Sequence, residues 1–171
     1  MDQWLKNIDQ RIGYYIAGFT DGEGSFNVSI KKRNDFRGGW RISPSFNISQ
    51  KDRVILARIK HVLGCGTLRE RHDGVVYYEV TNLHLLYERI IPFFKRFRFL
   101  SANKKKNFSI FEQIVNIMFY GAHLAPDGLK KVLALRERLN EPRGRERKYT
   151  MTDVMTEGSS ETTRKTPSIR G

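Results

Sequence analysis

Two acidic residues lie close together near the start of the chain, directly after an apolar segment. Residues 16–24 read IAGFTDGEG, so Asp21 and Glu23 are separated and followed by glycines. The apolar residues before them recur with helical spacing, which places both acids at the C-terminal end of a helix. Acids at that end oppose the helix dipole, which favours positive charge there. A hard divalent cation, bound by a carboxylate and a backbone carbonyl, would supply that charge.

A carboxylate-bound metal ion suits phosphodiester hydrolysis, because it activates water and stabilises the leaving oxygen. The overall charge favours such a substrate, since 31 Lys and Arg against 18 Asp and Glu give a formal net charge of +13. This charge indicates a nucleic-acid partner, with an anionic membrane surface as the weaker alternative. The alternative to a metal site is that the two acids merely form a helix end and its turn.

A chain with one such motif has too few acids to cleave both strands of a duplex. Two chains would therefore combine their acids around a two-fold axis.

Small residues on the same helix would allow two copies to pair. Gly18 and Gly22 are four residues apart, with Gly13 and Ala17 nearby. Such spacing lets two helix backbones approach closely. We therefore expect Gly18 and Gly22 in a dimer interface, although glycines at this spacing also occur by chance.

The elements that must position these residues follow the order helix, hairpin, helix, hairpin and three further helices. Apolar spacing predicts the helices over residues 9–21, 51–63, 83–94, 107–119 and 127–139. Alternation predicts two hairpins, one from strands 26–31 and 41–49 and one over 66–81 with Asp73 and Gly74 in its turn. We expect an α+β fold in which four antiparallel strands form one sheet with helices on its apolar face.

The polar face of the predicted sheet is a candidate DNA-reading surface. Arg and Lys suit guanine edges, Asn and Gln suit adenine, and β-ribbons fit the major groove. An ordinary solvated sheet face is the alternative. The outward residues are Asn27, Ser29, Lys31, Arg33, Arg41, Ser43, Ser45, Asn47, Arg69, Arg71, Tyr77 and Glu79.

The remaining sequence bounds the organisation of the chain. After residue 140 the composition turns polar and charged, so we expect one domain over residues 1–140 and a mobile basic tail over 141–171.

The aromatic stretch 93–99 could stack on bases, but we expect it in the core. The lone Cys65 excludes a cysteine-based zinc site within one chain. Because neither a membrane span nor a signal peptide is apparent, we expect a soluble intracellular protein with no membrane partner.

The motif IAGFTDGEG resembles the signature of the LAGLIDADG homing endonucleases, and the order of elements matches that family's αββαββα core over residues 12–119. Further agreement lies in the segments NISQKD, GCGTLRER, IIPFFKRF and LSANKKKNF. The resemblance implies a four-stranded antiparallel DNA-binding saddle, here with extra C-terminal helices.

The resemblance also implies roles for the motif residues. The last acid of the family motif, its usual metal ligand, corresponds to Glu23, where aspartate is commoner. The carbonyl of Gly22 is then a second metal ligand. Asp21 corresponds to the first acid of the motif and is expected to order the helix end.

Two further residues are expected at the active site by resemblance. Gln50 in NISQKD matches the polar residue that positions solvent near the metals. A lysine that stabilises charge near the scissile phosphate falls in LSANKKKNF, where Lys104 is favoured over Lys105.

The implied activity is that of an intron-encoded, homodimeric endonuclease. It would hydrolyse both strands of double-stranded DNA across the minor groove of a long pseudo-palindromic site. Mg²⁺ would be the cofactor, and Ca²⁺ is expected to support binding without cleavage. The alternatives are a non-cleaving DNA-binding regulator and an RNA-binding intron maturase on the same fold. The compartment would be a bacterial or archaeal cytoplasm or an organelle.

Overall fold

The computed structural model describes residues 3–33, 39–140 and 148–160 of the 171-residue chain. Among the residues that it describes, no helix combines the length and the apolar character that a membrane crossing requires. The described elements are α1 (Gln3–Lys6), α2 (Gln10–Glu23), β1 (Gly24–Lys32), β2 (Trp40–Gln50), α3 (Arg53–Leu63), β3 (Thr67–Glu70), β4 (Val76–Val80), α4 (Leu83–Leu85), η2 (Leu86–Ile90), α5 (Ile91–Arg96), α6 (Ala102–Phe119), η3 (Ala122–Leu124), α7 (Pro126–Arg138) and α8 (Met151–Ser160).

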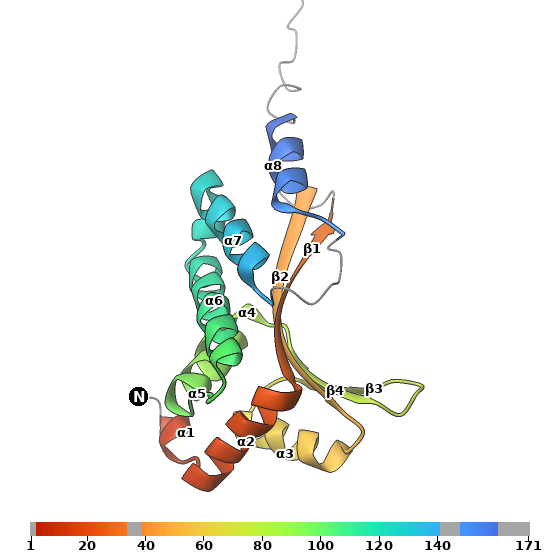
Figure 1. Ribbon diagram of the computed structural model, residues 1–171, viewed down its shortest axis with the longest axis vertical. Coiled ribbons are helices and arrows are strands. Elements are labelled where there is room, and N and C mark those ends of the chain that lie inside the picture. Colours follow the sequence, from red (N-terminus) through yellow and green to blue (C-terminus); the bar gives the residue numbers. More distant parts are fainter. Residues whose placement is uncertain (1–2, 34–38, 141–147, 161–171) are drawn as a thin grey trace, which may run out of the picture.

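The strands form one antiparallel sheet in the order β1-β2-β4-β3 (Figure 1). β1 pairs with β2 along its whole length, from Gly24 opposite Ile48 to Lys32 opposite Trp40. Of the residues of β2, only 46–50 pair with β4. The outer half of the β1–β2 hairpin therefore projects beyond the other two strands, toward α7 and α8 (Figure 1). The predicted α+β fold with a four-stranded antiparallel sheet is confirmed.

An aromatic core lies between the sheet and the helices. The ring of Phe26 on β1 lies 5.8 Å from that of Phe94, 5.9 Å from that of Phe99 and 5.0 Å from that of Phe111. All four side chains are buried. The aromatic stretch 93–99 therefore belongs to the core, as predicted, because it covers the apolar face that alternation gives to the strands.

The helix that carries the motif, α2, passes into the first strand without a loop. It begins after Asp9, whose side chain caps the helix by accepting hydrogen bonds from the N–H groups of Arg11 and Ile12. It ends at Glu23, two residues beyond the predicted end, because Gly22 remains helical. A Cβ on Gly24 would lie 2.5 Å from the methyl group of Thr20 and 2.8 Å from its carbonyl oxygen. Gly24, rather than Gly22, is therefore the glycine that this junction requires.

Two other differences from the predictions concern candidate site residues. α6 begins at Ala102, five residues before its predicted start, because Ser101 caps it by accepting a hydrogen bond from the N–H of Lys104 at 3.3 Å. The lysine-rich segment 104–106 therefore lies in the first turns of a helix. In the second hairpin, β3 and β4 are joined by residues 71–75, so Arg71 lies in the loop and not in a strand.

Part of the segment after residue 140 folds against the sheet. Val154 of α8 is 2% exposed and packs with Ile30, Trp40 and Leu133. The expectation of a mobile tail is therefore wrong for residues 148–156, because apolar side chains of this segment cover the outer half of the β1–β2 hairpin. The other predicted tail residues, 141–147 and 161–171, lie outside the described residues.

Candidate active site

The C-terminal end of α2 presents oxygen donors to solvent. Glu23, its last residue, is exposed, and so is Gly22. The N–H of Gly24 bonds to the carbonyl of Thr20 at the end of the helix. The next residues are extended, so the carbonyls of the last helical turn lack a donor further along the helix. A carboxylate beside such a carbonyl suits a hard divalent cation, which the negative end of the helix dipole also favours.

The donor set in one subunit is small. Within the described ranges, no group of three or more His, Cys, Asp or Glu side chains is placed to hold a metal ion. Glu23 and the carbonyl of Gly22 are thus the candidate donors that this helix end offers.

Asp21 connects the end of α2 to the start of α6. Its carboxylate accepts hydrogen bonds from the N–H groups of Leu100 at 3.2 Å and Ser101 at 3.0 Å, and from the Ser101 hydroxyl. Partial burial works against ionisation, but the hydrogen bonds from Ser101 and Leu100 and the charge of Lys104 outweigh it. They hold the pKa of Asp21 below its ordinary value of 3.8. Asp21 therefore orders the helix end, while Glu23 is left exposed beside it.

The first turn of α6 brings Lys104 to the same helix end. Its Nζ donates to the carbonyl of Gly24, the residue after Glu23. Lys105, one position further around the helix, is exposed. The geometry favours Lys104 over Lys105 as the lysine of this site. The polar cleft at this point is lined by Asp21, Gly24, Ser25, Phe26, Ser101, Asn103, Lys104, Asn107 and Asn140.

Gln50 is the last residue of β2. It lies two residues past Ile48, which pairs with Gly24, so it stands at the same end of the sheet as Glu23. Its Oε1 accepts a hydrogen bond from the N–H of Lys51 at 2.8 Å. Because side chains alternate along a strand, Gln50 lies on the same face of the sheet as the buried Ile48, and not on the outward face with Asn47.

The residues expected to read DNA share the outward face of the sheet, apart from two at its margins. Arg33 follows β1 and is exposed. Arg71 lies in the β3–β4 loop, where it donates to the Tyr77 hydroxyl at 3.0 Å and lies 3.4 Å from the Asp73 carboxylate. The cross-strand pairs on the face are Asn27 with Ser45, Ser29 with Ser43, Lys31 with Arg41, Asn47 with Glu79 and Arg69 with Tyr77.

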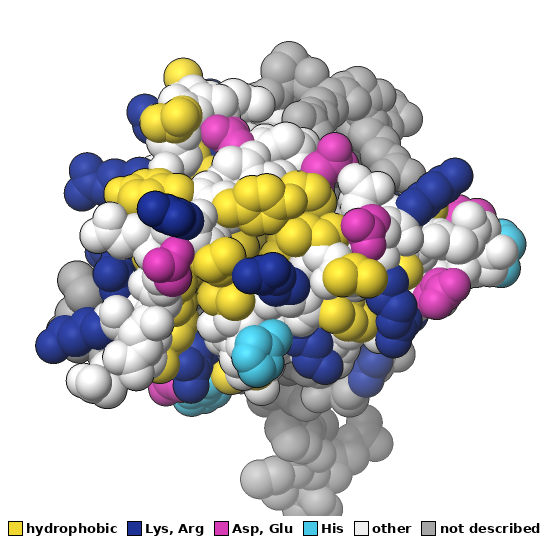
Figure 2. Space-filling model, turned by 90° about the horizontal axis from the view of Figure 1, so that it is seen from below, with side chains coloured by type: hydrophobic (Ala, Val, Ile, Leu, Met, Phe, Trp, Pro, Cys, Tyr) yellow, Lys and Arg dark blue, Asp and Glu magenta, His cyan; other side chains and the backbone are white. Residues whose placement is uncertain are grey.

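One side of α2 is open to solvent at Gly18 and Gly22. A Cβ on Gly18 or Gly22 would meet no heavy atom within 4 Å. Tyr14 and Tyr15, on the first turns of the same helix, are 56% and 54% exposed. Figure 2 shows hydrophobic side chains gathered on the lower face of the molecule, where α2 and α3 lie in Figure 1. No contact among the described residues of the subunit requires glycine at these two positions.

The other two small residues of α2 lie on its opposite side. Gly13 and Ala17 are buried. A Cβ on Gly13 would lie 2.3 Å from the ring of Phe97. Gly13 and Ala17 therefore pack within the subunit, and only Gly18 and Gly22 are available to a partner.

The sequence match defines the family of this chain. The family model for the LAGLIDADG endonuclease matches residues 16–115, more than half of the chain. The match begins in the middle of α2 and extends into α6, so it includes the end of α2 with Glu23 and the whole sheet. The chain belongs to the LAGLIDADG endonuclease family.

Individual relatives are similar over different shares of their length. Probable intron-encoded endonuclease 2 of Neurospora crassa is 35% identical over 130 residues, which are 74% of this chain and 28% of that protein. Homing endonuclease I-ApeII of Aeropyrum pernix is 35% identical over 103 residues, 59% of this chain and 60% of that protein. The chain thus spans less than two thirds of either relative. The structure of the archaeal intron-encoded homing endonuclease I-Vdi141I complexed with DNA superposes with a TM-score of 0.81 at 36% identity, covering 88% of this chain and 96% of that one.

Proposed function

We propose that the protein is a site-specific, Mg²⁺-dependent double-strand DNA endonuclease that acts as a homodimer and is encoded within an intron. The observation that carries the proposal is the exposed Glu23 carboxylate at the meeting point of α2, the sheet and the first turn of α6. The DNA complex of I-Vdi141I, similar over most of both chains, supports double-stranded DNA as the partner. The compartment would be that of the host gene, in a cytoplasm or an organelle.

Each subunit would contribute the same few groups to cleavage. Glu23 and the carbonyl of Gly22 would hold Mg²⁺. When bound, the ion supplies charge that lowers the pKa of water and stabilises the leaving oxygen. Gln50 would orient the attacking water, and the ammonium of Lys104 would stabilise charge on the scissile phosphate. Gly18 and Gly22 would let the two α2 helices approach closely enough for the carboxylates to share one cleavage region.

The sheet would read one half-site in the major groove. Lys31, Arg33 and Arg41 would supply phosphate affinity that weakens as salt rises, and their side chains also suit guanine edges. The polar residues of the outward face, including Asn27, Glu79 and the serines, would supply base contacts. A two-fold dimer implies a nearly palindromic target whose halves are read alike.

A cleavage assay on a randomised DNA pool tests this proposal. With Mg²⁺, the wild-type protein should cut a subset of sequences. Glu23→Gln should abolish cleavage but retain specific binding in Ca²⁺, because the amide keeps the shape and loses the charge that holds the ion. A Glu23→Gln protein that cuts at near the wild-type rate would refute the assignment. Specific DNA binding without cleavage by the wild type would favour a regulator instead, and stimulation of RNA splicing would favour a maturase.

A further inference from the structure

The first strand of the sheet has an edge that side chains cover. β1 pairs with β2 on one side, and no described strand pairs with its other side. Successive carbonyls of a strand point in alternate directions, so those of Gly24, Phe26 and Val28 point toward the same edge. An uncovered edge of this length would offer unpaired backbone groups.

Three side chains from the helical layer bond to those three carbonyls in turn. Lys104 Nζ donates to Gly24, at the catalytic end of the strand. Asn140 Nδ2 donates to Phe26 at 2.8 Å. Arg136 Nε donates to Val28 at 3.1 Å. We call Lys104, Asn140 and Arg136 the edge ladder. It attaches β1 to α6 and α7 over the half of the strand nearest to Glu23.

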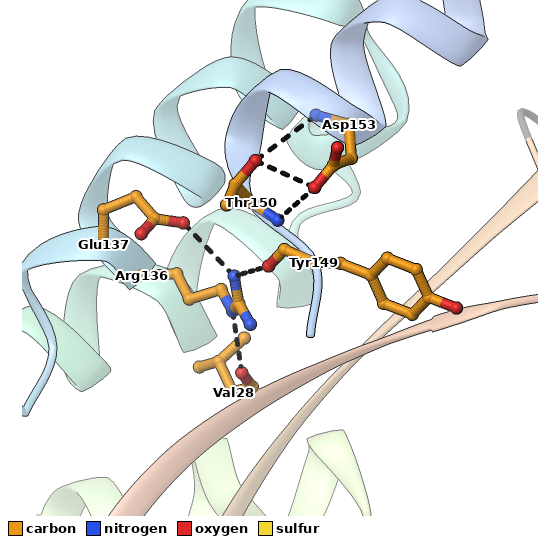
Figure 3. Close-up of polar contacts among 6 residues, drawn as sticks. All are labelled: Val28, Arg136, Glu137, Tyr149, Thr150 and Asp153. Carbon is orange, nitrogen blue, oxygen red and sulfur yellow. Dashed lines mark hydrogen bonds and ion pairs between the residues drawn. The ribbon is translucent and has the colours of Figure 1, made fainter. Parts of the chain in front are cut away.

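Arg136 is the outermost member of the edge ladder and is held from several directions (Figure 3). It is 8% exposed, and its Nη1 lies 3.2 Å from the Glu137 carboxylate. The same nitrogen donates to the carbonyl of Tyr149 at 2.9 Å. The Tyr149 ring packs edge-on against Trp40 of β2, with the ring centroids 4.9 Å apart. One guanidinium thus connects to both strands of the hairpin, to β1 directly and to β2 through Tyr149.

The segment that follows Tyr149 is fixed by its own cap. The N–H and hydroxyl of Thr150 donate to the Asp153 carboxylate at 2.7 and 2.9 Å, at the start of α8 (Figure 3). Val154 of α8 then completes the apolar contact with Ile30 and Trp40. Arg136 is therefore the polar centre of a clamp on the outer hairpin.

The position of the clamp divides the outward residues of the β1–β2 hairpin and of β4 into two sets, which leave out Arg69 and Arg71 beyond β4. β1 continues for four residues after Val28, about 13 Å, which matches roughly four base pairs of a duplex. The inner set lies on β4 or on the part of the hairpin that pairs with β4 or adjoins it, and comprises Asn27, Ser45, Asn47, Tyr77 and Glu79. The outer set comprises Ser29, Lys31, Arg33, Arg41 and Ser43.

We propose that Arg136 is a positioning residue for DNA specificity: it fixes the outer hairpin relative to Glu23 and so sets which base pairs the outer set reads. The inference rests on the proposed DNA-reading function. Arg136 needs no contact with DNA to act in this way, since displacement of the outer half of the hairpin misaligns the outer set, while pairing with β4 holds the inner half in place. Base recognition depends on hydrogen-bond geometry and tolerates little displacement.

The test is a comparison of binding preferences across a half-site. Wild type, Arg136→Met, Arg136→Lys and Arg138→Met are each used to select DNA from a randomised pool in Ca²⁺. Arg138→Met removes the same charge from an exposed position on the same helix. Arg136→Lys keeps a charged donor without the planar fork. Thermal unfolding of each variant is measured in parallel, so that only folded protein is compared.

Arg136→Met should lose discrimination at the outer base pairs by about fivefold or more per position while retaining it at the inner ones. Arg136→Lys should lie between this variant and the wild type, and Arg138→Met should keep the wild-type preference. If Arg136→Met does not fold, the same comparison is made with Arg136→Lys. An unchanged preference in a folded but less stable Arg136 variant would overturn the inference, as would equal loss at inner and outer positions.

Selection by binding separates this inference from the nuclease proposal. A wild-type protein that selects a sequence but does not cut it with Mg²⁺ would refute the nuclease proposal and still allow the Arg136 comparison. A wild-type protein that selects no DNA sequence would overturn the inference itself.

Discussion

Replacing Gly18 by alanine should stabilise the isolated subunit and weaken the dimer. A Cβ at this position has no heavy atom within 4 Å in the subunit, and alanine is favoured over glycine in a helix by about 1 kcal/mol. If Gly18 faces the partner helix, the same methyl group overpacks that contact at a cost of about 1–3 kcal/mol. The dimer Kd should then rise roughly 5- to 150-fold.

Gly13→Ala is the matched control on the same helix. A Cβ there lies 2.3 Å from the Phe97 ring, which is buried and packs against Phe93 with the ring centroids 5.0 Å apart. Overpacking should outweigh the gain in helix propensity, so the subunit should lose up to about 2 kcal/mol. The dimer interface itself should be unaffected.

Two measurements distinguish these outcomes. Urea unfolding at protein concentrations below the dimer Kd gives the stability of the subunit, and sedimentation equilibrium over a concentration series gives the Kd. An unchanged Kd for Gly18→Ala would refute the placement of this residue in the dimer interface. A less stable Gly18→Ala subunit would refute the inference that the position is sterically open.

Two further predictions concern the polar groups at the α2 helix end. Asp21→Asn should lower the free energy of unfolding at pH 7 by about 1 kcal/mol, because an amide cannot accept all the hydrogen bonds that Ser101 directs at the carboxylate. Since folding lowers the Asp21 pKa, this contribution is present above the unfolded pKa and lost as the pH falls through the folded one. The difference between wild type and variant in urea unfolding should therefore shrink below pH 3.8. Lys104→Met should slow single-turnover cleavage by about 10²–10³-fold and Lys105→Met by less than about tenfold; equal losses would contradict the choice of Lys104.

The local sequence pattern was sufficient to predict the faces of the sheet but not to predict where the helices begin and end. Apolar alternation in both hairpins fixes which face is buried, so the outward residues of the strands followed without knowledge of the pairing. Arg33 and Arg71 lie just outside the strands, because alternation does not specify where a strand ends. The end of α2 depends on contact between Gly24 and Thr20, which helix propensity does not include. The cap at Ser101 was readable from its residue type, but the apolar spacing from which this helix was predicted starts only at residue 107.

The C-terminal segment did contain a helical signal that composition obscured. Met151, Val154 and Met155 have helical spacing. Thr150 and Asp153, which bond to each other at the start of the helix, are the residue types of a helix cap. The abundance of charge and hydroxyl groups around them favoured disorder instead. Burial of three apolar residues against an existing hairpin is enough to order a short helix that would not form alone.

The edge ladder had no signal in the sequence. Lys104 and Gly24 are 80 residues apart, and Arg136 and Val28 are 108 residues apart. Asn140 adopts a left-handed conformation at φ 59°, which asparagine tolerates, and this places its side chain toward Phe26. Such contacts depend on how α7 crosses the sheet, which no local spacing specifies.

The direct passage of α2 into β1 has a consequence for how target preference can change. With no intervening loop, Glu23 and the first outward residues of β1 are parts of one continuous backbone segment. A shift of the helix would carry the acid and the reading side chains together. Under the proposed function, the distance between the cleaved bond and the recognised bases would therefore be built into the backbone. New targets would then evolve by exchange of side chains on the sheet without moving the point of scission.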